Sequence, residues 1–136
     1  MTKLTGGSTT SSGVTLSETV RLTIPAALEF VRIARLTASG VASRIGFDVD
    51  EIEDLRVAVD ELSSILVDLA SNDELELAFM PTIDGLEIEG RTRVEDSVSP
   101  AIDELTRQIL SVVVDEYGLE NTAGEARFRC VKRLSN

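Results

Sequence analysis

Residues 49–69 constrain the fold most, because one segment combines a helix start, a helix-length apolar pattern and an acidic face. Asp48 is a good N-cap residue, and Glu51 lies three residues further on, as in a capping box. Phe47 before the cap and Ile52 after it form a hydrophobic staple. Together these signals predict a helix over about residues 49–69.

This helix is predicted to have two chemically different faces. At about 100° per residue, one continuous arc holds only apolar side chains: Ile52, Leu55, Ala58, Val59, Leu62, Ile65, Leu66 and Leu69. The opposite arc is mainly acidic and includes Glu61, which lies one turn before Ile65 and is its neighbour on the surface. Glu61 is a candidate general base if burial raises its pKa. An acidic residue on a helix face is otherwise simply solvated.

Apolar alternation and helical periodicity place the other elements. Strands are predicted at 18–24, 74–80, 86–94 and 125–134, and helices at 25–45, 49–69 and 100–117. Pro25 and Pro100 suit first helical positions, whereas Gly46 and Gly118 suit helix ends. Asp84–Gly85 is typical of a hairpin turn.

Four strands and three helices in this order predict an α+β fold, a two-layer α/β sandwich. Its sheet would be four-stranded and mixed or antiparallel, with about three helices on one face. Residues 1–14 are mostly Thr, Ser and Gly and are expected to form a disordered tail. Residues 15–136 are expected to form a single domain.

Composition excludes several classes of function. The formal net charge of −11 repels phosphate backbones and anionic membranes, so we expect neither direct nucleic-acid binding nor membrane binding. A basic protein partner is compatible with it. The chain has no histidine, which excludes Ser–His–Asp and Cys–His nucleophiles and histidine-based zinc sites. The lone Cys130 is expected to be an inert core residue in a cytoplasmic protein.

The stretches "RLTIPAALEFVRIARLTASGVASRIGF" and "EIEDLRVAVDEL" resemble anti-sigma regulatory factors of the serine-protein-kinase type. These factors are part of the wider superfamily of histidine-kinase-like and gyrase-like ATPases. The resemblance covers most of residues 18–134 and implies an α/β sandwich that often dimerises. It also implies a protein partner, either a sigma factor or an anti-anti-sigma factor. Active family members use ATP and Mg²⁺ to phosphorylate a serine of the anti-anti-sigma factor.

The residues that would carry this chemistry depart from the family pattern at three places. Glu61 matches the family's glutamate base, but Ile65 stands where the family has a Mg²⁺-binding asparagine, and an alkyl group cannot ligate Mg²⁺. Asp96 is the nearest match to the adenine-reading aspartate, and no glycines follow it. Between Arg91 and Tyr117 there is no glycine, although a phosphate-cradling lid needs several.

These departures favour a non-catalytic regulatory binding protein that needs no cofactor and no metal. One alternative is an ATP-dependent serine kinase that uses Glu61 as base, with Asp60 or Asp68 as substitute Mg²⁺ ligands. A second alternative is a structural or dimerisation module. The sequence leaves all three open.

Overall fold

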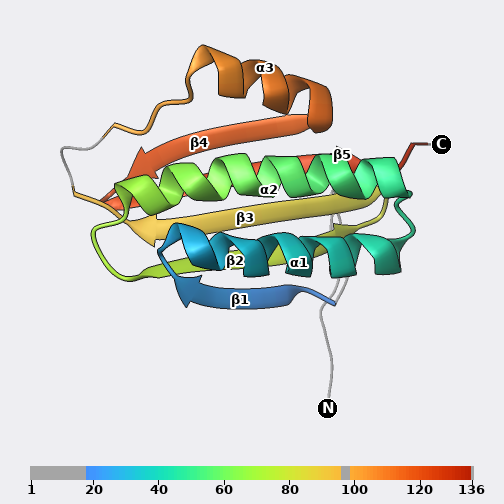
Figure 1. Ribbon diagram of the computed structural model, residues 1–136, viewed down its shortest axis with the longest axis horizontal. Helices are drawn as coiled ribbons and strands as arrows, with labels where there is room; N and C mark the ends of the chain where they lie inside the picture. The colour runs from blue at the N-terminus through green and yellow to red at the C-terminus, as the bar shows by residue number, and fades with distance from the viewer. Residues whose placement is uncertain (1–17, 96–98, 136) are drawn as a thin grey trace.

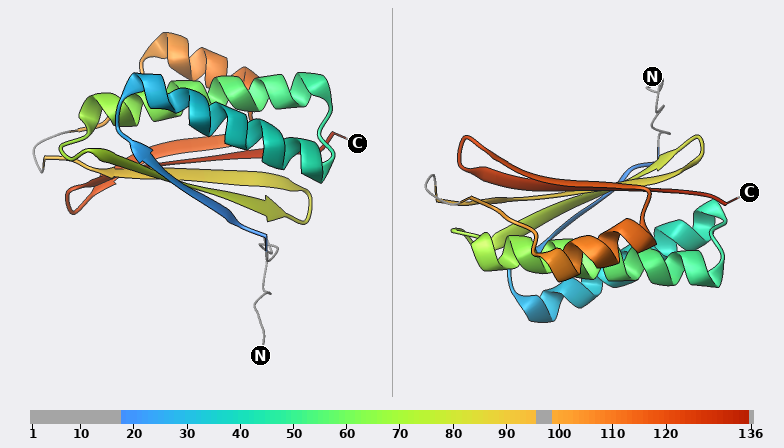
Figure 2. Two further views of the ribbon diagram at one scale, coloured as in Figure 1. Left: turned by 60° about the horizontal axis from the view of Figure 1, so that its bottom comes forward. Right: turned by 90° about the horizontal axis from the view of Figure 1, so that it is seen from above.

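The computed structural model describes residues 18–95 and 99–135, which form three helices packed on one face of a five-stranded antiparallel sheet. Figure 1 shows α1 and α2 side by side over the sheet and α3 beside its β4 edge, and Figure 2 shows that all helices lie in one layer. The predicted two-layer α+β sandwich is confirmed. The predicted tail at 1–14 and Asp96 lie outside the described residues.

The elements follow one another as β1 (Val20–Pro25), α1 (Leu28–Ile45), α2 (Val49–Leu69), β2 (Glu74–Thr82), β3 (Gly85–Arg93), α3 (Glu104–Val113), β4 (Glu116–Thr122) and β5 (Glu125–Arg133). The strand order across the sheet is β1-β2-β3-β5-β4. Antiparallel hairpins join β2 to β3 and β4 to β5, so most of the sheet is built from neighbours in sequence.

Helix α2 forms as its local signals predict. The Glu51 N–H donates to Asp48 Oδ1, and the Asp48 N–H donates to Glu51 Oε1, both at 2.8 Å. This capping box satisfies amides that the first turn of a helix leaves unpaired. At the end of α1, Gly46 adopts a left-handed φ of 112°, the C-terminal role expected of it.

The prediction of four strands was wrong, because the segment expected to end the third helix forms a fifth strand. Helix α3 stops at Val113, and Tyr117 and Gly118 lie in β4 rather than at the end of a helix. Three consecutive β-branched residues at 112–114 weaken the helix there. A two-residue turn then joins β4 to β5 with positive φ angles of 54° at Ala123 and 77° at Gly124.

Two predicted helix starts were also wrong. Pro25 ends β1 instead of opening α1, and an edge strand tolerates it because no ladder partner needs its missing N–H. Helix α3 begins at Glu104, after Pro100, because Asp103 supplies the N-cap. The Asp103 carboxylate accepts the Thr106 N–H at 2.8 Å.

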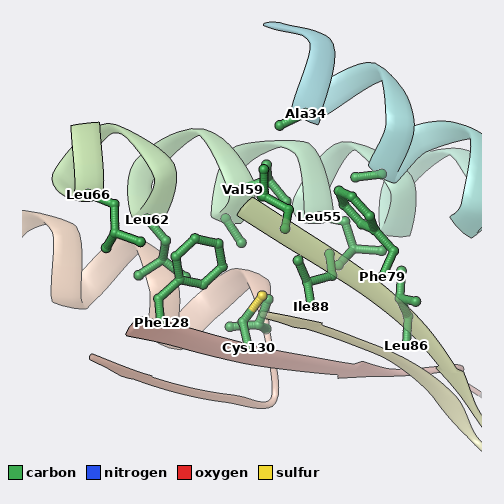
Figure 3. Packing of buried hydrophobic residues seen from close by; sticks show 14 of the residues in the cluster. Ala34, Leu55, Val59, Leu62, Leu66, Phe79, Leu86, Ile88, Phe128 and Cys130 are labelled. Carbon is green, nitrogen blue, oxygen red and sulfur yellow. The ribbon is translucent and has the colours of Figure 1, made fainter. Parts of the chain in front are cut away.

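The hydrophobic core lies between the helix layer and the sheet (Figure 3). Fully buried side chains of α2 meet fully buried side chains of the sheet: Leu55, Val59, Leu62 and Leu66 from α2, and Phe79, Ile88, Phe128 and Cys130 from β2, β3 and β5. At Gly90 an added Cβ would lie 2.3 Å from a ring carbon of Phe128, so only glycine lets this ring sit against β3.

The other face of the sheet has no helix on it (Figure 2) and carries alternating arginines and glutamates. Arg91 pairs with Glu76 at 2.9 Å, and Arg129 pairs with Glu87 at 2.8 Å. These half-exposed pairs tie adjacent strands together. Within the part of the chain that the structure describes, no helix is long and apolar enough to cross a bilayer.

Candidate functional site at the interface of α2 and α3

Helix α2 is the central element of the candidate site, because it contacts α1 on one side and α3 on the other (Figure 1). On the α1 side, Arg35 Nη1 donates to Asp60 Oδ1 at 2.6 Å. This contact directs the Asp60 carboxylate to α1. Asp60 therefore points toward α1, about 100° round the helix axis from Glu61.

Glu61 lies on the opposite side of α2 and is half-buried. The hydroxyl of Thr106 in α3 donates to Glu61 Oε1 at 3.3 Å. Ile65, one turn further along α2, is also half-buried, at the edge of the apolar arc. The structure thus brings a glutamate and a hydroxyl together where α2 meets α3, with an isoleucine one turn further along α2.

Lys132 of β5 closes one end of this interface. Its Nζ donates to the carbonyl oxygen of Val113 at 2.9 Å and lies 3.4 Å from Asp54 Oδ2 on α2. The lysine side chain is only 12% exposed, so both contacts offset the cost of burying its charge. Lys132 therefore fixes the C-terminal end of α3 against α2.

The residues present do not fit a Mg²⁺ ion at Glu61. Mg²⁺ needs several oxygen ligands in near-octahedral geometry. Ile65 offers none, Asp60 is held by Arg35, and Asp68 lies exposed, two turns beyond Glu61. Among the described residues, no group of three acidic, histidine or cysteine side chains is placed to hold a metal ion.

The connection from β3 to α3 also differs from a phosphate-binding lid. It runs over residues 94–103 and contains no glycine. The candidate adenine reader, Asp96, lies outside the described residues, so its role stays a prediction.

Cys130 is buried in the core, as expected from the sequence. Burial raises the pKa of its thiol to about 12, because the thiolate would be cut off from water. The reactive form of cysteine is the thiolate, so Cys130 is chemically inert here.

Sequence reasoning placed Glu61 and Ile65 on α2 but missed the residues that surround them. Thr106 lies 45 residues from Glu61, and Lys132 lies 78 residues from Asp54. No local pattern links such distant positions. A weak signal for Thr106 did exist, since Asp103 three residues earlier is a good N-cap.

Both the sequence and the fold of this chain are similar to those of known proteins. No family model matches the chain. The serine-protein kinase RsbW of Bacillus velezensis is 53% identical over 55 residues, which are 40% of this chain and 34% of that protein. The serine-protein kinase RsbW of Bacillus subtilis is 44% identical over 73 residues, which are 51% of this chain and 46% of that protein. The aligned parts therefore span less than half of these relatives.

Among solved structures, the RsbU and RsbW domains of Rv1364c from Mycobacterium tuberculosis superpose with a TM-score of 0.71. The match covers 89% of this chain and 34% of that one, at 17% sequence identity. This chain therefore shares its fold with part of that structure. The resemblance inferred from the sequence is confirmed, with RsbW proteins as the named relatives.

Proposed function

We propose that this protein is a regulatory binding protein that resembles an anti-sigma factor and acts without Mg²⁺–ATP. It would bind a sigma factor or an anti-anti-sigma factor by direct protein contact, in the cytoplasm. Similarity to proteins named serine-protein kinase RsbW supports the family context. The aligned parts cover less than half of those proteins, so the activity and partners of the whole relatives are only proposed for this chain.

The observation that carries the proposal is Ile65. It lies one turn from Glu61 on the side of α2 that faces α3, where a kinase of this type would need a Mg²⁺ ligand. The Thr106 hydroxyl donates to one oxygen of the Glu61 carboxylate, and Asp60 faces α1. A serine kinase with Asp60 or Asp68 as substitute ligands is therefore the weaker alternative.

The outer face of α1 offers a surface for protein contact. Leu28 and Leu36 expose 58% and 59% of their surface, and Ile33 exposes 41%. Arg32 is exposed between Leu28 and Leu36, with the spacing of successive helical turns. Exposed apolar residues around an arginine are typical of interface cores.

Purified protein titrated with sigma factor or anti-anti-sigma factor from the same genome tests this proposal. We expect a complex without nucleotide, weakened by Leu36→Asp but not by Ile83→Asp, since Ile83 lies on the β2–β3 hairpin and is 78% exposed. Phosphate transfer to a serine of the anti-anti-sigma factor would favour the kinase instead.

The proposal includes a homodimer as a partner state. The helix-free face of the sheet carries both signs of charge in alternation, which permits pairing with a second copy. Sedimentation of the free protein measures this directly. A monomer that still binds its partner would remove dimerisation from the proposal and would exclude the purely structural alternative.

A further inference from the structure

Helix α3 buries only some of its apolar side chains. Leu110 and Val113 are buried, whereas Leu105 and Val112 expose 68% and 80% of their surface. Leu105, Ile109 and Val112 are spaced by four and three residues, so they form one line along α3, here called the apolar stripe. Ile109 is half-buried against the core, so Leu105 and Val112 form the part of the stripe that α3 leaves in water.

The apolar stripe lies at the outer surface, on the side of α3 that borders α2. At about 100° per residue, Thr106 comes between core-facing Leu110 and the apolar stripe. Thr106 itself contacts Glu61 of α2. Around the axis of α3, Leu110 therefore faces the core, Thr106 faces α2, and the apolar stripe comes next, further from the core.

Helix α2 contributes a line of carboxylates next to this stripe. Asp54, Glu61 and Asp68 are spaced by seven residues, so they follow one side of α2; they are here called the acidic ridge. Asp54 and Glu61 contact Lys132 and Thr106, which places the ridge on the α3 side. Asp68 is exposed. The ridge belongs to a helix with seven carboxylates and one arginine.

We propose that the apolar stripe and the acidic ridge bind a basic amphipathic helix of a protein partner. Apolar side chains of that helix would cover the stripe, and its Lys or Arg side chains would face the ridge. From Asp54 to Asp68 the ridge spans about 21 Å, which matches about 14 residues of helix. This inference rests on the proposed function because it assumes a protein partner. It adds a second contact surface for that partner.

Charge selects this occupant over a second copy of the chain. A second copy that paired through this surface would bring its own acidic ridge close to the first, and the like charges would repel one another. A basic helix is attracted to the acidic ridge and also removes Leu105 and Val112 from water.

The probe is a designed helical peptide of about 14 residues, with leucines along one face and lysines beside them. The control is the same peptide with glutamate in place of each lysine. Fluorescence anisotropy with the full chain, at low and high salt and without nucleotide, gives both affinities. We expect the lysine peptide to bind, its affinity to fall with salt, and the glutamate peptide not to bind.

Variants of the protein then locate the site. Leu105→Ser with Val112→Ser should weaken the lysine peptide at least about tenfold, and Asp68→Asn should reduce both its affinity and its salt dependence. The matched control is Ile83→Ser with Val49→Ser, which removes two residues that are 78% and 81% exposed elsewhere. This control should bind like the parent.

Three results would overturn the inference: no binding of the lysine peptide, equal loss in the matched control, or self-association that Leu105→Ser with Val112→Ser abolishes. Each leaves the proposed function standing, because the titration contains neither ATP nor a sigma factor. Conversely, Mg²⁺–ATP binding would refute the proposed function without touching the peptide result.

Discussion

The two interfaces of α2 are built differently. Against α1, the small residues Ala34, Ala38 and Ala42 are fully buried and permit close approach of two long helices, with the Arg35–Asp60 pair beside them. Against α3, a ten-residue helix, the direct hydrogen bond among the described residues runs from Thr106 to Glu61 at 3.3 Å.

This difference separates a closely packed helix interface from a more open one. The α1–α2 interface uses close packing that tolerates little change. The α2–α3 interface combines the buried Leu110 and Val113 with the half-buried Glu61 and Thr106. It is also where Ile65 departs from the family pattern. The fold therefore accommodates an isoleucine at position 65.

The largest effect is expected from overpacking the α1–α2 interface. Ala38→Leu adds three carbons at a fully buried position and should lower the free energy of unfolding by about 1–3 kcal/mol. Urea denaturation measures the change. Ser43→Leu, at an exposed position of the same helix, is the matched control and should change stability little. Equal effects would show that the interface is not closely packed.

A smaller effect is expected at the α2–α3 interface. Ile65→Asn places an amide at a half-buried position and should cost about 1 kcal/mol. The same variant should not gain Mg²⁺–ATP binding, because residues 94–103 still lack glycines. Strong ATP binding by this single variant would show that a glycine lid is unnecessary.

The Arg35–Asp60 pair should contribute less still. Its side chains are 29% and 44% exposed, so solvent screens the attraction. A double-mutant cycle with Arg35→Ala and Asp60→Ala should give a coupling energy of about 0.2–1 kcal/mol. A coupling energy near zero would leave the alanines as the sole cause of the tight interface.

The smallest effect is expected for the pH dependence of stability at Glu51, which lies outside both interfaces. The Asp48 N–H, followed by the Ser135 hydroxyl, holds the pKa of Glu51 below its usual value. A lowered folded-state pKa contributes stability above the unfolded-state pKa, and this stability is lost as pH falls through the folded-state value. Melting temperatures from neutral to acidic pH should therefore drop slightly less for Glu51→Gln than for the parent. An identical drop would contradict the assigned contacts.

The sequence predicts those features of the fold whose signals lie within a few residues of one another. Helix α2 was predicted correctly because Asp48 and Glu51 act within one turn. Strand β4 was missed because Ala123 in its turn lacks the usual Asn or Asp before glycine, although it adopts a positive φ. At the site, Glu61 and Ile65 were placed correctly on α2. The contact of Glu61 with Thr106 of α3 depends on packing between distant segments.

The central claim is that the protein keeps the fold of its kinase relatives without Mg²⁺–ATP chemistry. Titration of the full chain with Mg²⁺–ATP in a calorimeter tests it most directly. The account predicts no saturable heat, because Ile65 supplies no ligand and the β3–α3 connection supplies no glycine lid. Saturable one-to-one binding in the micromolar range would contradict it.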